Sequence, residues 1–153
     1  MAKTATRANL YTSASITAGT VVRSAVLDCS AVDGGIITAK MTNGATGPTA
    51  QGTIRLLFAH KQTSAPTAAA EGTAETDWKI VAEVGAGTAA LGYSKLVYSF
   101  GPEKAGYFHI EFGQHTVQAV TGEAQASTRI PGTAFCPSAS PSCCWPSGSW
   151  RWT

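Results

Sequence analysis

Short stretches with apolar residues at every second position recur along the chain from about residue 20 onward. A period of two is typical of β-strands, whose successive side chains point to opposite faces of a sheet. Turn-forming residues separate the stretches at intervals of roughly 8–12 residues, which indicates a sandwich or jelly roll. No stretch shows a helical period. We therefore expect an all-β fold, a single-domain antiparallel β-sandwich, jelly-roll-like, with about seven to eight strands. The expected strands span residues 20–29, 34–42, 52–60, 77–85, 93–101, 106–113 and 116–128.

The same alternation assigns side chains to the two faces of each strand. In residues 106–113, the apolar positions 108, 110 and 112 are expected to face the core. The opposite face then carries Tyr107, His109 and Glu111, exposed to solvent or to a partner. In the strand at 77–85 the inward positions are expected to be Trp78, Ile80, Ala82 and Val84.

Glycine, proline and asparagine mark the connections between these strands. Asp33, Gly34 and Gly35 form a turn signal, and residues 102–105 read as a short, hairpin-like connection. Residues 61–76 are polar and small, which predicts a surface loop. The strand at 116–128 is less apolar than the others, so we expect it near the edge of a sheet.

Composition divides the chain into three parts: an N-terminal arm over residues 1–15, the sandwich over 16–130 and a tail over 131–153. The arm has no apolar segment of the kind a secretory signal requires, which predicts synthesis and folding in a cytoplasm. The tail contains three of the four Trp, three of the four Cys and four of the seven Pro residues. Proline at this density does not join a central strand. The tail is either a non-native or frame-shifted sequence or a natural extension whose Trp side chains dock into a neighbour.

Charge is scarce in this sequence. Charged residues make up 13% of the chain, about half of the roughly 25% found in ordinary soluble domains. The formal net charge is +2, without a run of Lys or Arg, which argues against direct nucleic-acid binding. No apolar stretch approaches the ~18 residues of a membrane span. A surface of small, weakly charged side chains costs little to desolvate and suits packing against neighbours, although any Thr-rich β protein shares this composition.

The sequence contains no recognisable catalytic or cofactor motif. Phosphate-binding glycine loops and a GxSxG nucleophile turn are absent. Cys29 follows an apolar run and is expected to be a buried thiol, and no two Cys residues have CxxC spacing. His109 and Glu111 are the best metal candidates, but two ligands are too few for a site. We expect no catalytic residue, no metal and no cofactor.

Four segments together resemble a known group of proteins. They are GGIITAKMTNGATGPTAQGTIRLLFAH, DWKIVAEV, YSFGPEKAGYFHIEFG and VTGEAQAS. They resemble small structural proteins encoded beside the major capsid proteins of tailed bacteriophages, and in particular the jelly-roll cement (decoration) proteins on the heads of short-tailed phages such as the Bordetella phage. The likeness covers roughly residues 10–130 and rests on turn and strand motifs. The tail from Pro131 onward has no counterpart in the pattern.

The resemblance implies a virion structural protein on the outer capsid surface, made in the cytoplasm of a bacterial host. Such a protein binds the mature icosahedral shell and cements neighbouring major capsid protein subunits against the pressure of packaged DNA. Its partners are the major capsid protein and itself, with a homodimer favoured and a trimer possible. No direct contact with nucleic acid or membrane is implied.

On this reading, contacts to the shell come from the chain's N-terminal residues 2–11, the turn at 43–51 and the loop at 61–76. The candidate contact residues in these segments are Arg7, Tyr11, Asn43, Gln51, Lys61 and Glu71. For each single residue, however, the simpler explanation is an ordinary exposed side chain.

Other classes of protein remain open. A carbohydrate-binding sandwich would need several exposed aromatic side chains on one concave face, for which Tyr93, Tyr107 and Trp78 are available. A head–tail or tail structural protein would assemble into rings. A hydrolase with a triad hidden from sequence motifs is disfavoured because the chain has only three Asp and three His residues.

Overall fold

The computed structural model describes residues 5–60, 66–71, 78–113 and 120–129. These ranges contain nine β-strands and one short 3-10 helix, η1 (Pro102–Lys104), so they hold no helix that could cross a lipid bilayer. The strands are β1 (Ala5–Ile16), β2 (Val21–Arg23), β3 (Leu27–Asp28), β4 (Gly35–Asn43), β5 (Thr53–Ala59), β6 (Lys79–Gly85), β7 (Tyr93–Phe100), β8 (Tyr107–Gly113) and β9 (Val120–Arg129). The predicted all-β fold is confirmed.

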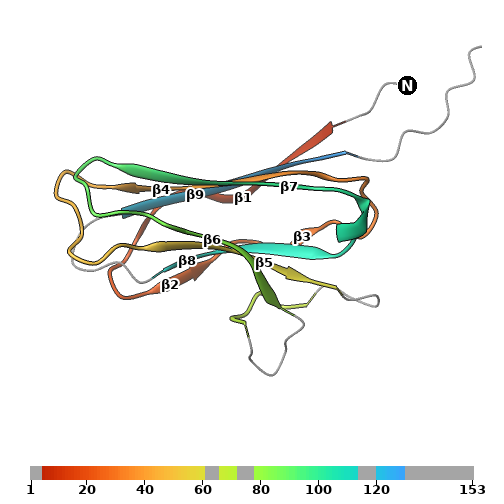
Figure 1. The fold of residues 1–153 in the computed structure, drawn as a ribbon, viewed down its shortest axis with the longest axis horizontal. Helices are drawn as coiled ribbons and strands as arrows, with labels where there is room; N and C mark the ends of the chain where they lie inside the picture. Colours follow the sequence, from red (N-terminus) through yellow and green to blue (C-terminus); the bar gives the residue numbers. More distant parts are fainter. Residues whose placement is uncertain (1–4, 61–65, 72–77, 114–119, 130–153) are drawn as a thin grey trace, which may run out of the picture.

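Two antiparallel sheets lie face to face (Figure 1). The first sheet has the strand order β1-β9-β4-β7, and the second has the order β2-β8-β5-β6. β2 and β3 both pair with β8, one beyond the other, so they share a single strand position. Apart from the steps from β2 to β3 and from β5 to β6, every connection crosses from one sheet to the other. Eight strand positions with this winding form a jelly roll.

The main core lies between the sheets. Side chains from alternate positions of both sheets are fully buried there, including Ile37 and Met41 from the first sheet and Phe108 and Phe112 from the second. The ring of Phe108 lies with its centroid 4.9 Å from that of Phe100, which joins the two sheets. Each such side chain contributes about 1.5–3 kcal/mol by leaving water.

The sandwich begins at Ala5, earlier than expected, because residues 5–15 of the predicted arm belong to β1. This strand pairs with β9 along its whole length, with two register shifts between Asn9 and Ala14. The shifts interrupt the period of two, and small Ala, Ser and Thr side chains fill most other positions. The strand therefore has no clear alternation in the sequence.

The prediction that the strand at 116–128 lies at an edge is wrong. β9 runs between β1 and β4, at the centre of the first sheet. Its inward positions are small because bulky neighbours occupy the space: a Cβ atom at Gly122 would come within 2.7 Å of the Ile16 side chain. The low hydrophobicity of β9 therefore reflects its close packing against bulky neighbours and not exposure to solvent.

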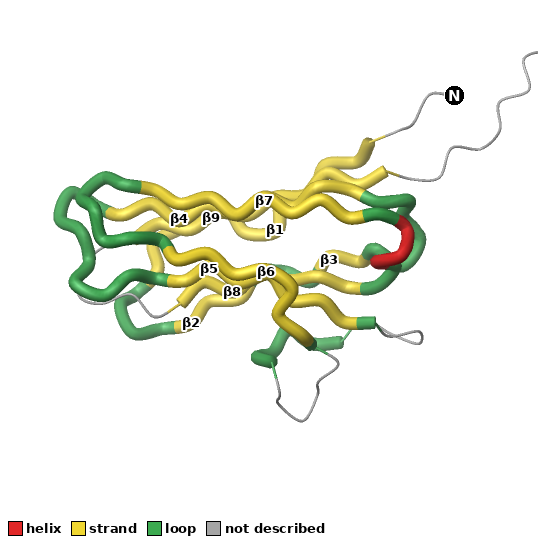
Figure 2. The backbone as a smooth tube through the Cα atoms, viewed as in Figure 1, coloured by secondary structure: helices red, strands yellow, loops and turns green. Residues whose placement is uncertain are grey.

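Two predicted connections differ from the structure. Residues 102–105 do not close a hairpin, since β7 and β8 lie in different sheets and η1 carries the chain between them (Figure 2). Residues 20–29 form two short strands, β2 and β3, with a break between them. In this break, Ser24 Oγ accepts a hydrogen bond from the Ile110 amide of β8 (2.8 Å). The turn at Gly34 is confirmed, with φ of 124°, a value that glycine tolerates best.

β8 is buried on both faces, which overturns the expected exposure of Tyr107, His109 and Glu111. Residues 66–71 and Trp78 cover the outer side of the second sheet and form a small second core there. Trp78 meets His109 edge to face, with 4.3 Å between ring centroids. The polar face of this strand is therefore an interior surface.

β6 differs from its predicted alternation for a related reason. A register shift between Ile80 and Ala82 places Ile80 opposite Leu57 and Ala82 opposite Leu56. Ile80 consequently lies on the outer side of the sheet, where it is exposed, whereas Ala82 packs on the main core as expected. Trp78 is buried as predicted, but in the second core.

Candidate functional site

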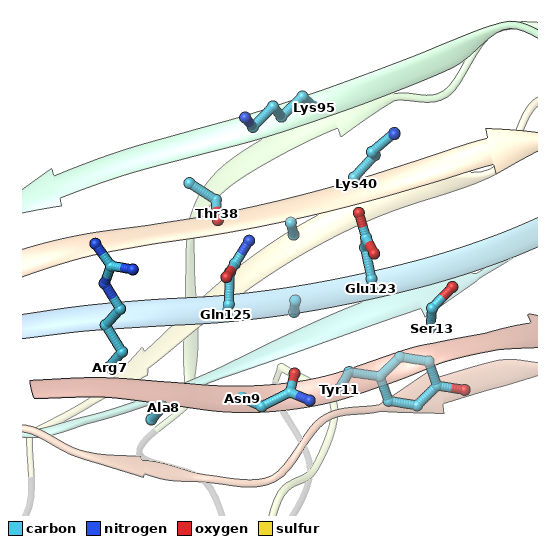
Figure 3. A pocket seen from close by; sticks show the side chains of 12 residues that line it. Arg7, Ala8, Asn9, Tyr11, Ser13, Thr38, Lys40, Lys95, Glu123 and Gln125 are labelled. Carbon is cyan, nitrogen blue, oxygen red and sulfur yellow. The ribbon is translucent and has the colours of Figure 1, made fainter.

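A groove of about 620 Å³ crosses the outer face of the first sheet (Figure 3). All four strands of that sheet contribute to it. Its lining residues are Arg7, Ala8, Asn9, Tyr11, Ser13, Thr38, Ala39, Lys40, Lys95, Glu123, Ala124 and Gln125. The strand register builds the groove, because it places Thr38 beside Gln125 and Lys40 beside Glu123 on the outward face.

The groove is basic. Arg7, Lys40 and Lys95 carry three positive charges against one negative charge on Glu123, which leaves a surplus of two. Lys40 lies between Glu123 and Lys95 in the ladder, and its Nζ is 4.9 Å from the centre of the Tyr93 ring. Within the described part of the chain, these charged groups form no ion pair with one another. They are available to an external acidic group.

Two of the predicted contact residues, Arg7 and Tyr11, line this groove together. Arg7 is exposed on β1, opposite Ser127 of β9. Tyr11 is half-buried, and its ring packs against Phe112 of the core with 5.4 Å between centroids. Tyr11 therefore has a packing role in addition to its place at the groove.

Asn43 and Gln51 lie away from the groove, at one end of the sandwich. Asn43 is buried, and its Nδ2 donates hydrogen bonds to the carbonyl oxygens of Gly87 (3.3 Å) and Ala89 (2.9 Å). It ties the loop at 86–92 to the end of β4 and presents no surface to a partner. Gln51 is exposed and accepts a hydrogen bond from the Gly87 amide (3.3 Å).

Glu71 lies on the outer side of the second sheet. Its Oε2 accepts a hydrogen bond from the Ile80 amide at the start of β6 (3.0 Å), and its Oε1 is 3.4 Å from Lys79 Nζ. The hydrogen bond from Ile80 lowers the pKa of the Glu71 carboxyl. Lys61 falls outside the described residues. The predicted contact residues are thus not all assembled into one surface.

The second sheet carries a row of alternating charges that sequence reasoning missed. Arg23, Glu111, Arg55 and Glu83 stand opposite one another on four adjacent strands. Arg23 Nε is 3.1 Å from Glu111, Arg55 Nη1 is 3.5 Å from the same carboxylate, and Arg55 Nε is 2.6 Å from Glu83. Two positive and two negative charges balance within the row, so the row stabilises the sheet and leaves little net charge to attract a partner.

His109 and Glu111 have internal partners. His109 Nε2 donates to the carbonyl oxygen of Ala69 (3.0 Å), which fixes the tautomer with an unprotonated Nδ1. Burial lowers the pKa of His109, and no described group bonds to its Nδ1. Within the described ranges, His, Cys, Asp and Glu side chains do not gather in threes as a metal site would require.

Cys29 is fully buried, as expected. Burial, with a smaller contribution from the neighbouring Asp28 carboxylate, raises the pKa of its thiol to about 12. A thiol that stays protonated at neutral pH is a poor nucleophile and a poor metal ligand. Cys29 therefore packs as a small apolar side chain.

The three aromatic side chains considered for carbohydrate binding do not form a platform. Tyr93 is 64% exposed on the first sheet, whereas Trp78 and Tyr107 are buried in the second core. A stacking surface for a sugar ring needs exposed aromatic faces on one side of the molecule.

No model of a known protein family matches the chain, and no curated protein matches its sequence. One solved structure with some likeness carries the description "Bacillus endospore appendages form a novel family of disulfide-linked pili". The match has a TM-score of 0.40 and 18% sequence identity, and it covers 85% of this chain and 90% of that chain. A likeness at this level supports no inference about function.

Proposed function

We propose that this chain is a virion structural protein that binds the outside of the mature icosahedral capsid and cements neighbouring major capsid protein subunits. The observation that carries the proposal is the basic groove on the outer face of the first sheet, which contains Arg7 and Tyr11. The resemblance of the sequence motifs to those of phage cement proteins suggests the class of partner. The chain acts as a homo-oligomer and needs no cofactor. A dimer is favoured over a trimer.

The groove suits adhesion because its side chains stand on paired strands. Arg7, Lys40 and Lys95 are held on β1, β4 and β7, so binding orders little backbone and costs less entropy than a flexible arm would. A protein that binds only the mature lattice stabilises it by mass action at many equivalent positions. The same contact resists the outward pressure of packaged DNA.

The test is binding to purified mature capsids that lack the protein. The double variant Arg7→Glu with Lys40→Glu should bind at least about tenfold more weakly, because it reverses two charges of the groove. Lys79→Glu is the matched control: its side chain is exposed on β6 of the opposite sheet. Equal binding of the groove variant and the wild type would contradict the proposal, as would an equal loss in the control.

A carbohydrate-binding module of a phage particle is the second candidate. The polar lining of the groove favours it, since Asn9, Gln125 and Glu123 offer hydrogen bonds to hydroxyl groups. Binding to immobilised glycans without binding to capsids would select this candidate. A head–tail or tail structural module would instead assemble into rings, which negative-stain microscopy of the pure protein would reveal.

A further inference from the structure

Strand β7 is an open edge of the first sheet (Figure 1). It pairs with β4 residue for residue, from Tyr93 opposite Thr42 to Phe100 opposite Gly35, without a register shift. No proline interrupts it. Within the described ranges, no side chain or loop hydrogen-bonds to its free side. Eight residues of regular, unpaired edge form a template for another strand.

The other edges are protected in ways that β7 is not. β1 has two register shifts, and β2 and β3 are three and two residues long. β6 has a register shift, and Glu71 accepts the hydrogen bond of the Ile80 amide. Shifts, short strands and capping side chains are the usual means of preventing pairing between edges. β7 is the most regular of the described edges, and its one charged side chain is Lys95.

The outward face of the first sheet also carries exposed apolar side chains on and beside β7. Tyr93 is 64% exposed and Val97 is 61% exposed, and Ile36 of the neighbouring β4 is 48% exposed. Ile36 lies opposite Ser99, so it is diagonal to Val97 on the same face. In a chain with only 13% charged residues, a regular edge beside exposed apolar side chains would promote uncontrolled association unless it has a defined partner.

We propose that the defined partner is a second copy of this chain, which pairs through β7 in antiparallel orientation about a two-fold axis at Val97. The first sheets of the two copies then form one continuous sheet with the order β1-β9-β4-β7-β7-β4-β9-β1. The inference specifies the self-association that belongs to the proposed function, but its test needs no capsid.

Side-chain chemistry favours this register over one centred on Lys95. With Val97 on the axis, the two Val97 side chains meet, and Lys95 of each copy lies opposite Ser99 of the other. Ile36 of each copy flanks the pair. A register with Lys95 on the axis would place like charges directly opposite each other, which is destabilising. A pairing centred on Val97 also aligns residues 94–100, almost the whole strand.

The two-fold axis of such a pair is perpendicular to the sheet, so both basic grooves face the same way. One dimer would therefore present two copies of Arg7, Lys40 and Lys95 to a single surface. Two linked contacts hold a surface more tightly than one, because the second binds at a high effective concentration. This geometry suits a protein that bridges neighbouring subunits.

Sedimentation velocity over a range of concentrations tests the self-association of the full chain. We expect a dimer for the wild type and at least about a tenfold weaker dimer for Val97→Lys, which brings two ammonium groups together on the axis. Gln125→Lys is the matched control, since it adds the same charge to an exposed position of β9, away from the edge. A monomeric wild type, or a Val97→Lys variant that dimerises like the wild type, would overturn the proposal.

Cysteine cross-linking tests the register. In a background where Cys136, Cys143 and Cys144 are serine, Val97→Cys should form an intermolecular disulfide under mild oxidation, because only a residue on the axis meets its own copy. Ser99→Cys is on the same face but opposite Lys95, so it should cross-link poorly. Equal cross-linking of both variants would exclude the proposed axis. Neither result depends on the cementing role, which capsid binding tests separately.

Discussion

His109 shows how one residue can contradict its sequence pattern. Alternation assigns it to an exposed face, yet it is fully buried between β8 and the segment at 66–71. Its Nε2 donates a hydrogen bond to the carbonyl oxygen of Ala69, and Trp78 Nε1 donates one to the carbonyl oxygen of Thr67 (2.8 Å). These two bonds attach the segment to the second sheet. A neutral imidazole is therefore part of the folded structure.

This burial predicts acid-sensitive stability. Burial lowers the pKa of His109 in the fold, an effect larger than the opposing influence of Glu111, whereas the unfolded chain titrates near ~6.5. The unfolded state therefore takes up the proton first as pH falls. The stabilisation is complete above pH ~6.5 and is lost progressively below it. We expect the free energy of unfolding to fall as the pH is lowered from 7.5 to 5.5.

Denaturant titrations of the wild type and His109→Gln check this expectation. Glutamine keeps an N–H donor for the Ala69 carbonyl but does not titrate. The variant should lose much less stability over the same pH interval, whatever its stability at pH 7.5. Parallel pH dependences of the two proteins would show that other groups control the acid response.

At the scale of elements, sequence periodicity located the strands better than it assigned their faces. β4, β5, β7 and β8 match the expected ranges closely, because they alternate regularly and end at turn residues. The faces of β8 and β6 were misassigned for two reasons, neither of which the period of the sequence can show. A covering segment buries the outer side of β8, and a register shift in β6 reverses the alternation at Ile80.

The groove was only partly predictable for the same reason. Arg7 and Tyr11 were identified from their place near the N-terminus, but Lys40, Lys95 and Glu123 come from strands distant in the sequence. They become neighbours only through the register of β4 with β7 and β9. Pairing between strands that are not consecutive in the chain leaves no mark in the local sequence.

The loop at 86–92 depends on Asn43. Asn43→Ala removes both hydrogen bonds of Nδ2 and leaves the Gly87 and Ala89 carbonyl oxygens without that donor. Loss of a buried donor costs about 1–3 kcal/mol, which chemical denaturation should detect. The amide of Leu91, bonded to the Gly44 carbonyl oxygen (2.9 Å), should also exchange with deuterium faster.

Gln51→Ala is the control for this variant. Gln51 reaches the same loop with a single hydrogen bond of 3.3 Å and is exposed, so its removal should cost less than about 0.5 kcal/mol. An Asn43→Ala protein as stable as the control would show that the loop is held by its backbone contacts alone.

At the scale of the whole molecule, the two sheets have different electrostatic characters. The outer side of the second sheet is covered in part by residues 66–71, and its charges are paired in a row. The outer face of the first sheet carries a basic surplus, exposed apolar side chains and an open edge. The adhesion that we propose, to a second copy at the edge of the first sheet and to a capsid at its outer face, would use each of these features.

The most direct test of the proposed cementing role is the copy number of this protein in purified virions from its source, by quantitative mass spectrometry. The account predicts on the order of hundreds of copies per particle, in a small-integer ratio to the major capsid protein, as the repeated symmetry of the shell requires. Absence from the particle, or about a dozen copies as expected of a neck or tail ring, would contradict it.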